Sequence, residues 1–298
     1  MENMSWRGVA AVLVSATCFG GTSILIKKAY TYGLTPVQVM FLQSWIASAL
    51  LLAYNLAFNR SMFVIDPKTL GVLALQGLVG SLGTSLLYSY SLLYLPVSVA
   101  ILLLYLYPGL VMGASAVFWH RRVSGREAGA LLLTLMGTAL ASGIFSGIGP
   151  VAKTGILLGI GSALAYTVFN VVGELALADE SPLRVMSFAQ WFSSLGLLVY
   201  LREQALALPW QLASTWTIGL ALATIASIAP FYLLLVGIKY LGADKAAILS
   251  TFELPMTFVL AALLLAEFPH WHEWLGGSLV LAGIVILNWR GKRVSLLE

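Results

Sequence analysis

Charged residues are scarce in this chain. Only 9% of its 298 residues are Asp, Glu, Lys or Arg, whereas 60% are hydrophobic and the mean hydropathy is +0.93. A water-soluble domain of this length needs far more charge to cover its surface. The composition therefore predicts an integral membrane protein, with the lipid bilayer as its solvent. It argues against a nucleic-acid partner, although the net charge is +4.

Cysteine and the motifs of soluble enzymes are also nearly missing. Cys18 is the single cysteine, so neither an intrachain disulfide nor a cysteine-cluster metal site can form. No catalytic Ser/His/Asp set, phosphate-binding loop or dinucleotide-binding glycine motif occurs in a suitable context, so we expect no enzymatic activity and no cofactor. The group of possible metal ligands lies in a predicted loop beside two tryptophans. This setting favours a membrane interface over a metal site; the group consists of Glu267, His270, His272 and Glu273.

Ten apolar segments are long enough to cross a bilayer, which takes ~20 residues in a helix. Glycine, proline and charged residues separate them. The predicted spans of the first half are residues 6–28, 36–58, 69–93, 97–119 and 126–145. Those of the second half are residues 153–175, 182–201, 214–238, 243–266 and 273–290. We therefore expect an all-α integral membrane protein with ten transmembrane helices.

The basic residues predict the orientation of these helices, because cytoplasmic loops hold an excess of Lys and Arg. With the N-terminus inside, twelve of the sixteen basic residues fall on the cytoplasmic side. Lys27, Lys28, Lys153 and Arg202 fall on the outer side. Both termini are thus expected in the cytoplasm. A cleaved signal peptide is the less favoured reading of the first segment, because that segment has a counterpart in the second half.

The sequence partly matches itself when it is shifted by 146 or 147 residues. The matches include Gly8 with Gly155, Pro36 with Pro182, Trp45 with Trp191, Tyr94-Leu95 with Tyr240-Leu241, and Pro108 with Pro255. Each half has an odd number of predicted spans, so the second half enters the membrane from the opposite side. We predict two inverted-topology five-helix repeats, residues 1–147 and 148–298. Such symmetry favours a transporter that works by alternating access.

These residues resemble the EamA-type domain pair of the drug/metabolite transporter superfamily, over nearly the whole chain. The resemblance is carried by Tyr94-Leu95-Pro96 with Ala100, Tyr240-Leu241-Gly242-Ala243 with Ala246, Glu267, Trp274-Leu275-Gly276-Gly277 and Leu281-Ala282-Gly283. In the first half, His120-Arg121-Arg122 stands where a glutamate usually appears. Within the family the chain is most similar to the YddG-type amino-acid exporters. The resemblance implies export of amino acids or related small metabolites through the bacterial cytoplasmic (inner) membrane.

Glu253 is the most unusual residue in the predicted spans. It falls about ten residues into the ninth span, near mid-bilayer at ~1.5 Å per residue, where a carboxylate costs ~2.5–3.5 kcal/mol on insertion scales. It either binds a substrate ammonium, carries a proton as coupling ion, or serves as a structural polar clamp. Pro255 and its counterpart Pro108 are predicted helix breaks at the same depth, and paired interruptions indicate a midplane binding site.

Aromatic and polar residues surround the expected cavity. Aromatic walls with a few polar groups suit amphiphilic or cationic solutes, although the same residues also serve ordinary helix packing. The candidate substrate-binding residues besides Glu253 are Phe19, Ser85, Tyr88, Tyr105, Tyr107, Tyr166, Phe169, Asn170 and Tyr232.

Lys27 and Glu174 are equivalent under the shift of 147 residues. The predicted topology places Lys27 near the outer mouth of the expected cavity and Glu174 near the inner one. They act either as gates for charged substrates or as charged side chains that reach the membrane interface.

The predicted function is a secondary transporter that exports amino acids or small amphiphilic metabolites, with protons as a candidate coupling ion. Efflux of organic cations or drugs is the alternative transport function. A membrane enzyme or lipid-handling scaffold is the alternative of another class, but it requires a cluster of catalytic residues at one membrane face.

Overall fold

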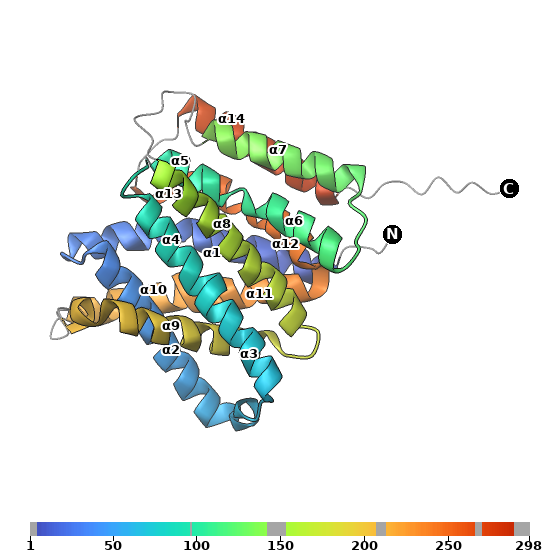
Figure 1. Ribbon diagram of the computed structural model, residues 1–298. Helices are drawn as coiled ribbons and strands as arrows, with labels where there is room; N and C mark the ends of the chain where they lie inside the picture. The colour runs from blue at the N-terminus through green and yellow to red at the C-terminus, as the bar shows by residue number, and fades with distance from the viewer. Residues whose placement is uncertain (1–4, 96, 142–152, 207–212, 266–269, 289–298) are drawn as a thin grey trace.

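The computed structural model describes residues 5–95, 97–141, 153–206, 213–265 and 270–288 (Figure 1). Regular secondary structure in these residues is helical. The first half contains α1 (Trp6–Thr31), α2 (Pro36–Phe58), η1 (Arg60–Phe63), α3 (Pro67–Leu75), η2 (Gln76–Leu82), α4 (Gly83–Ser91), α5 (Val97–Leu104), α6 (Tyr107–Phe118) and α7 (Gly125–Ala141). The second half contains α8 (Lys153–Ala176), α9 (Pro182–Leu206), α10 (Ala213–Ala223), η4 (Thr224–Ile228), α11 (Ala229–Leu241), α12 (Ala243–Ser250), α13 (Glu253–Leu265) and α14 (Trp271–Asn288).

Seven helical segments of the described chain are long and apolar enough to cross a membrane. They are residues 6–31, 37–58, 67–91, 99–118, 153–176, 213–241 and 243–264. The predicted all-helical fold is thus confirmed. The predicted spans 126–145, 182–201 and 273–290 are helical where they are described, as α7, α9 and α14, but they do not reach the same length and hydropathy. The count of ten spans stays a prediction, and the predicted boundary between residues 147 and 148 lies outside the described residues.

Short capping motifs start the helices at the predicted breaks. Thr35 and Gln38 form a capping box before α2: the Thr35 hydroxyl accepts from the Gln38 N–H at 3.3 Å, and the Gln38 amide oxygen accepts from the Thr35 N–H at 2.9 Å. A carboxylate oxygen of Asp66 accepts from the N–H groups of Lys68 and Thr69, each at 3.0 Å, before α3. Prolines in the first turn of both helices lack an N–H that would otherwise need a partner.

Several long helices are interrupted at equivalent places in the two halves. The segments η2 and η4 are π-helical stretches that continue into α4 and α11. Turns at Tyr105-Leu106 and Thr251-Phe252 separate α5 from α6 and α12 from α13, directly before Pro108 and Pro255. Proline lacks an N–H and clashes with the carbonyl four residues earlier, which explains why each helix is broken at this point.

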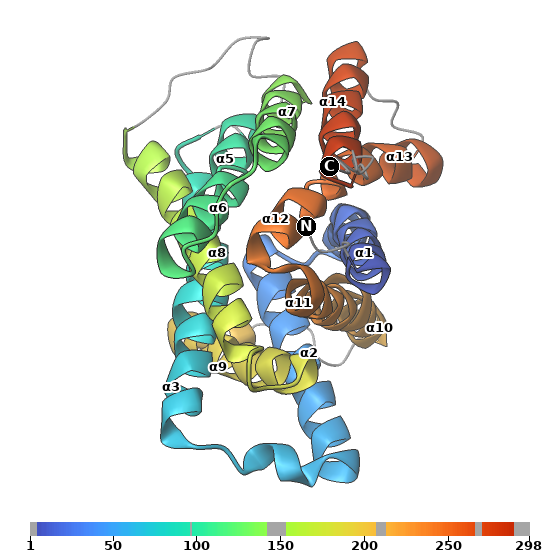
Figure 2. The same cartoon turned by 90° about the vertical axis from the view of Figure 1, so that its right-hand side faces the viewer.

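Glycines bring helices of the two halves into close contact. Helix α1 packs along α11, and α8 packs along α4 (Figures 1 and 2). A Cβ atom on Gly8 would lie 2.7 Å from Leu241 Cγ, and one on Gly155 would lie 2.6 Å from Leu95 Cγ. The same glycine–leucine contact therefore occurs twice, at positions related by the sequence repeat. Only the smallest residue leaves room for these neighbours.

Helices α7 and α14 pack against each other at one side of the bundle (Figure 2). Their backbones touch, because a Cβ atom on Gly137 would lie 2.6 Å from the carbonyl oxygen of Gly276. Small residues at such crossings allow the close van der Waals contact that associates helices in a bilayer.

We predict that Gly137→Leu destabilises the protein by about 1–3 kcal/mol, because the added side chain would meet the backbone of α14. Gly129→Leu on the same helix is the matched control, since nothing lies within 4 Å of a Cβ atom there. Melting of the purified protein in detergent measures the difference. Equal melting temperatures for the two variants would contradict the close crossing of α7 and α14.

Candidate functional site

Six aromatic side chains form a continuous cluster through the centre of the bundle. The ring centroids are 6.2 Å apart for Tyr105–Tyr107, 4.5 Å for Tyr107–Tyr166, 5.8 Å for Tyr166–Phe169, 5.4 Å for Phe169–Phe231 and 5.1 Å for Phe231–Phe19. We call these six residues the aromatic cluster. They come from α1, α6, α8, α11 and the turn after α5. Five of the candidate substrate-binding residues are thus side by side, together with Phe231.

Glu253 lies at one end of the aromatic cluster, in the first turn of α13. The Tyr105 hydroxyl is within hydrogen-bonding reach of its carboxylate, and the hydroxyls of Tyr88, Tyr107 and Tyr166 are within electrostatic range of it. Among the described residues, no Lys, Arg or His forms an ion pair with Glu253. The neighbours of this carboxylate in the described chain are therefore neutral hydroxyl groups rather than cations.

The other candidate residues are placed in different surroundings. Asn170 is buried; its amide nitrogen donates to the Tyr166 carbonyl at 2.8 Å, but its amide oxygen has no partner in the described chain. Tyr88 is partly buried and packs against the small buried cluster of Leu95, Val99 and Ala100. Tyr232 is 38% exposed and is not part of the aromatic cluster.

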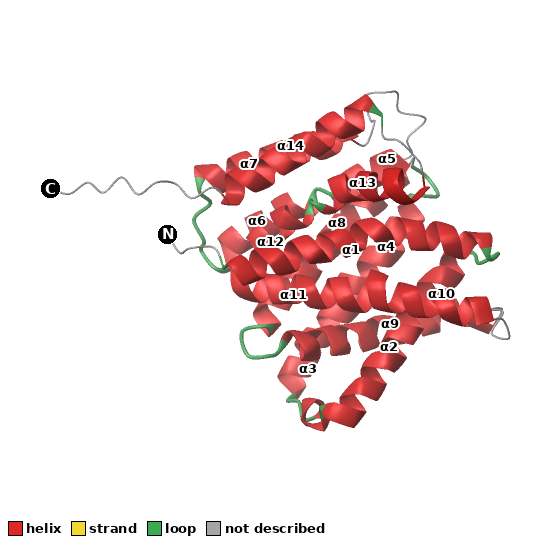
Figure 3. Ribbon diagram, turned by 180° about the vertical axis from the view of Figure 1, so that it is seen from behind, coloured by secondary structure: helices red, strands yellow, loops and turns green. Residues whose placement is uncertain are grey.

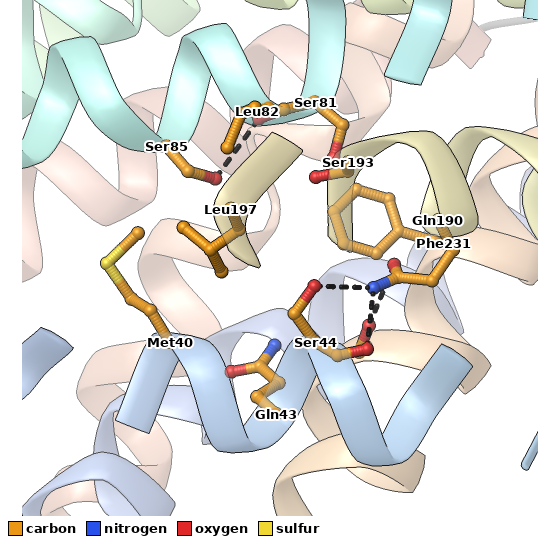
Figure 4. Close-up of a pocket in the computed structure, with 11 residues that line it drawn as sticks. Met40, Gln43, Ser44, Ser81, Leu82, Ser85, Gln190, Ser193, Leu197 and Phe231 are labelled. Atoms are coloured by element: carbon orange, nitrogen blue, oxygen red, sulfur yellow. Dashed lines mark hydrogen bonds between the residues drawn. The ribbon is translucent and has the colours of Figure 1, made fainter. Parts of the chain in front are cut away.

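Ser85 lines a separate cavity of about 110 Å³, which we call the polar cavity (Figure 4). The walls of this cavity come from α2, η2 with α4, α9, and η4 with α11. Its polar lining residues are Gln43, Ser44, Ser81, Ser85, Gln190, Ser193 and Ser227, and its apolar ones are Met40, Leu82, Leu197 and Phe231. Phe231 belongs to both the polar cavity and the aromatic cluster, so the two features share a wall.

Equivalent residues of the two halves bond to each other where α2 crosses α9. The amide nitrogen of Gln190 donates to the Ser44 hydroxyl at 3.0 Å (Figure 4). The hydroxyls of Ser48 and Ser194 are 2.6 Å apart. The members of each pair are 146 residues apart, which is the offset of the repeat. The sequence reasoning missed this site. The sequence pattern that could have revealed it is a pair of polar residues four positions apart, and therefore on one face, in each of the two matched helices.

A network of ion pairs lies at another place, around Arg121. The Arg121 guanidinium bonds to the carboxylate of Glu174, and its other terminal nitrogen bonds to Asp244 at 3.0 Å. Glu174 also accepts from the backbone N–H of Ala243 at 2.8 Å. We call Arg121, Glu174 and Asp244 the Arg121 network. It joins the loop before α7 to α8 and α12, so it connects the first half of the chain to the second. Of the two gate candidates, Glu174 takes part in it, whereas Lys27 lies exposed on α1.

Two unusual backbone conformations shape the Arg121 network. His120 has φ 51°, and Gly242, before α12, has φ 86°. A Cβ atom on Gly242 would lie 2.5 Å from the Arg121 guanidinium, so only glycine fits here. Burial opposes the charge of Arg121, but the bonds to Glu174 and Asp244 outweigh this cost and raise its pKa above the usual value. The guanidinium is therefore held as a permanent cation. A cavity of about 570 Å³ lies beside it.

Comparisons with known proteins show which proteins this chain is similar to. Residues 6–143 and 153–289 each match the model of the EamA-like transporter family. An uncharacterized transporter of Archaeoglobus fulgidus is 27% identical over 285 residues, which cover 95% of this chain and 96% of the relative. The uncharacterized inner membrane transporter YicL of Salmonella typhimurium is 23% identical over 300 residues, with 96% and 97% covered. One crystal structure has a TM-score of 0.79 at 20% identity, covering 94% of this chain and 95% of its own, and therefore shares the fold.

We predict that Arg121→Met lowers the melting temperature, because it leaves Glu174 and Asp244 facing each other without a cation. The coupling between Arg121→Met and Glu174→Gln in a double-mutant cycle should be about 1 kcal/mol and should shrink at high salt. Arg60→Met is the control, because the Arg60 guanidinium donates to the Leu56 carbonyl at 2.7 Å, within the same half of the chain. Additive effects of the two substitutions in the cycle would show that the network does not hold the halves together.

Proposed function

This chain belongs to the EamA-like transporter family, and we propose that it is a secondary transporter that exports amino acids or related small metabolites from the bacterial cytoplasm. It is a multi-pass membrane protein, since it has seven candidate membrane spans and relatives that are named transporters. Membership in the family supports transport and argues against an enzyme. The observation that carries the proposed substrate class is Glu253, a carboxylate among tyrosine hydroxyls at the end of the aromatic cluster.

The proposed mechanism is alternating access by two inverted five-helix repeats, residues 1–147 and 148–298. The recurring features described above support it: the contacts of Gly8 and Gly155, the paired helix interruptions, and the bonds between equivalent residues of α2 and α9. In this mechanism the two halves exchange conformations, so that the central site opens to one side at a time. The Arg121 network closes one end of the interface between the halves, and the ion pairs would break when that end opens.

We place the protein in the cytoplasmic (inner) membrane, with both termini in the cytoplasm. The start of α1 and the end of α14 lie at the same end of the bundle (Figure 3), as this orientation requires. The basic residues Arg121, Arg122 and Lys245 line the cavity at the Arg121 network. The excess of Lys and Arg in cytoplasmic loops would make this end the inner one. In that orientation, the closed end of the structure faces the cytoplasm.

Solute recognition is assigned to Glu253 and the aromatic cluster. A carboxylate with no competing cation attracts the ammonium of an amino acid, and the electron-rich faces of the tyrosines add to this attraction. The phenylalanines Phe19, Phe169 and Phe231 offer an apolar surface to the carbon atoms of the solute. The same carboxylate can bind a proton in place of the solute ammonium, and this exchange would couple export to a proton gradient.

Efflux of organic cations or drugs is the second candidate, because a carboxylate beside aromatic rings also suits a bulky cation. The two candidates differ in competition: an organic-cation transporter is inhibited more strongly by aromatic cations than by amino acids. A membrane enzyme or lipid-handling scaffold has no comparable support in the described residues.

We expect saturable uptake of at least one amino acid into proteoliposomes that contain the purified protein. The assay measures counterflow of labelled amino acids, with empty liposomes as the control and tetraphenylphosphonium as a competing organic cation. If no amino acid shows saturable flux, the proposed substrate class is wrong. Stronger inhibition by tetraphenylphosphonium than by any amino acid would favour the second candidate.

We predict that Glu253→Gln abolishes transport driven by a proton gradient and spares part of the counterflow, because glutamine keeps the shape of the side chain but cannot exchange a proton. Glu127→Gln, at the start of α7, is the control and should keep gradient-driven transport. If Glu253→Gln retains gradient-driven transport, Glu253 is a structural clamp rather than the coupling group.

A further inference from the structure

The polar cavity has hydrogen-bonding groups but no charge. Its lining consists of two primary amides, five serine hydroxyls and four apolar side chains. An ionised group that entered it would lose its water and gain no opposite charge, which is costly at membrane depth. The chemistry of the lining therefore suits an uncharged solute group that donates and accepts hydrogen bonds, such as a carboxamide or a hydroxyl.

Several polar atoms of the cavity are not used by the protein itself. The amide nitrogen of Gln43 donates to the Ala226 carbonyl at 3.1 Å, but its amide oxygen has no partner in the described chain. The hydroxyls of Ser81 and Ser193 donate no hydrogen bond to any described residue, although Ser193 is only 7% exposed. Figure 4 shows Gln43 on one side of the cavity and the two serines on the other. These unused groups converge on the same space.

The position of the cavity connects it to the transport site. Phe231, in its wall, contacts Phe169 edge-on with ring centroids 5.4 Å apart, and Phe169 continues into the aromatic cluster. Ser81 and Leu82 lie in the π-helical stretch η2, and Ser227 lies in its counterpart η4. Such π-helical stretches widen a helix and occur often at functional sites. Both interruptions thus contribute residues to one cavity between the two halves.

We propose that the polar cavity binds the uncharged polar side chain of the transported solute, so that amino acids with an amide or hydroxyl side chain are preferred over apolar ones of the same shape. This inference rests on the proposed function, since it names the solutes that the same transporter selects. The volume of about 110 Å³ limits the bound group.

The experiment compares threonine with valine, which have nearly the same shape, in counterflow and in binding to the purified full-length protein. We expect the unmodified protein to prefer threonine. Ser193→Ala removes a hydroxyl that bonds to nothing in the described protein, so it should reduce the preference about fivefold or more without changing the melting temperature. Ser162→Ala is the matched control: this buried serine on α8 bonds to the Gly159 carbonyl at 2.7 Å and lies outside the cavity. It should leave the preference unchanged.

The outcomes separate this inference from the proposed function. Two outcomes overturn the role of the cavity while amino-acid transport stands. One is saturable flux of threonine and valine with equal affinity, and the other is a preference for threonine that Ser193→Ala leaves intact. If no amino acid is transported, the proposed function fails. The cavity is then tested alone by protection of Ser193→Cys, in a Cys18→Ser background, against a thiol reagent. Protection by acetamide or glycerol supports the site, and absence of protection overturns it.

Discussion

Polar atoms inside a bilayer cannot bond to water, so each must find its partner within the protein. Short side chains do so locally: the hydroxyls of Thr17, Thr138 and Thr167 each donate to a carbonyl one turn earlier, at 2.8 Å. A glutamine reaches farther and can bond to another helix. Gln76 donates to the Phe169 carbonyl at 3.2 Å, and Gln43 donates to the Ala226 carbonyl at 3.1 Å. These few amides therefore help to decide which helices are neighbours.

The same constraint makes polar groups without a partner candidates for binding a solute, a proton or water. Within the described residues, Gln43 and Ser193 keep unused atoms at the polar cavity, and Glu253 has tyrosine hydroxyls beside it but forms no ion pair. Such groups lower stability unless a solute, a proton or water satisfies them. In the Arg121 network, by contrast, Arg121 bonds to both Glu174 and Asp244 across the two halves. These central groups and the ion pairs at one end fit the proposed transporter in a state closed at that end.

Symmetry connects these features. Gly8 and Gly155 make the same contact twice, and Ser48 meets its own counterpart Ser194 where α2 crosses α9. In two repeats related by a two-fold axis, as proposed above, a residue bonds to its own counterpart only near that axis. The polar cavity borders this crossing and receives residues from both π-helical stretches, so a movement that exchanges the two halves would change its walls together.

The helical fold and most helix boundaries follow from the amino-acid sequence alone, because hydrophobic length, capping residues and prolines act locally. The sequence also indicated the aromatic residues Tyr105, Tyr107 and Tyr166 as a group. Only the tertiary structure decided that Arg121 pairs with Glu174, that Gln43 and Ser193 face one cavity, and that Tyr232 stays outside the cluster. Helices with little amphipathic pattern do not reveal which face meets which neighbour. Contacts between helices far apart in the chain appear only when the glycine crossings and polar bonds set the packing.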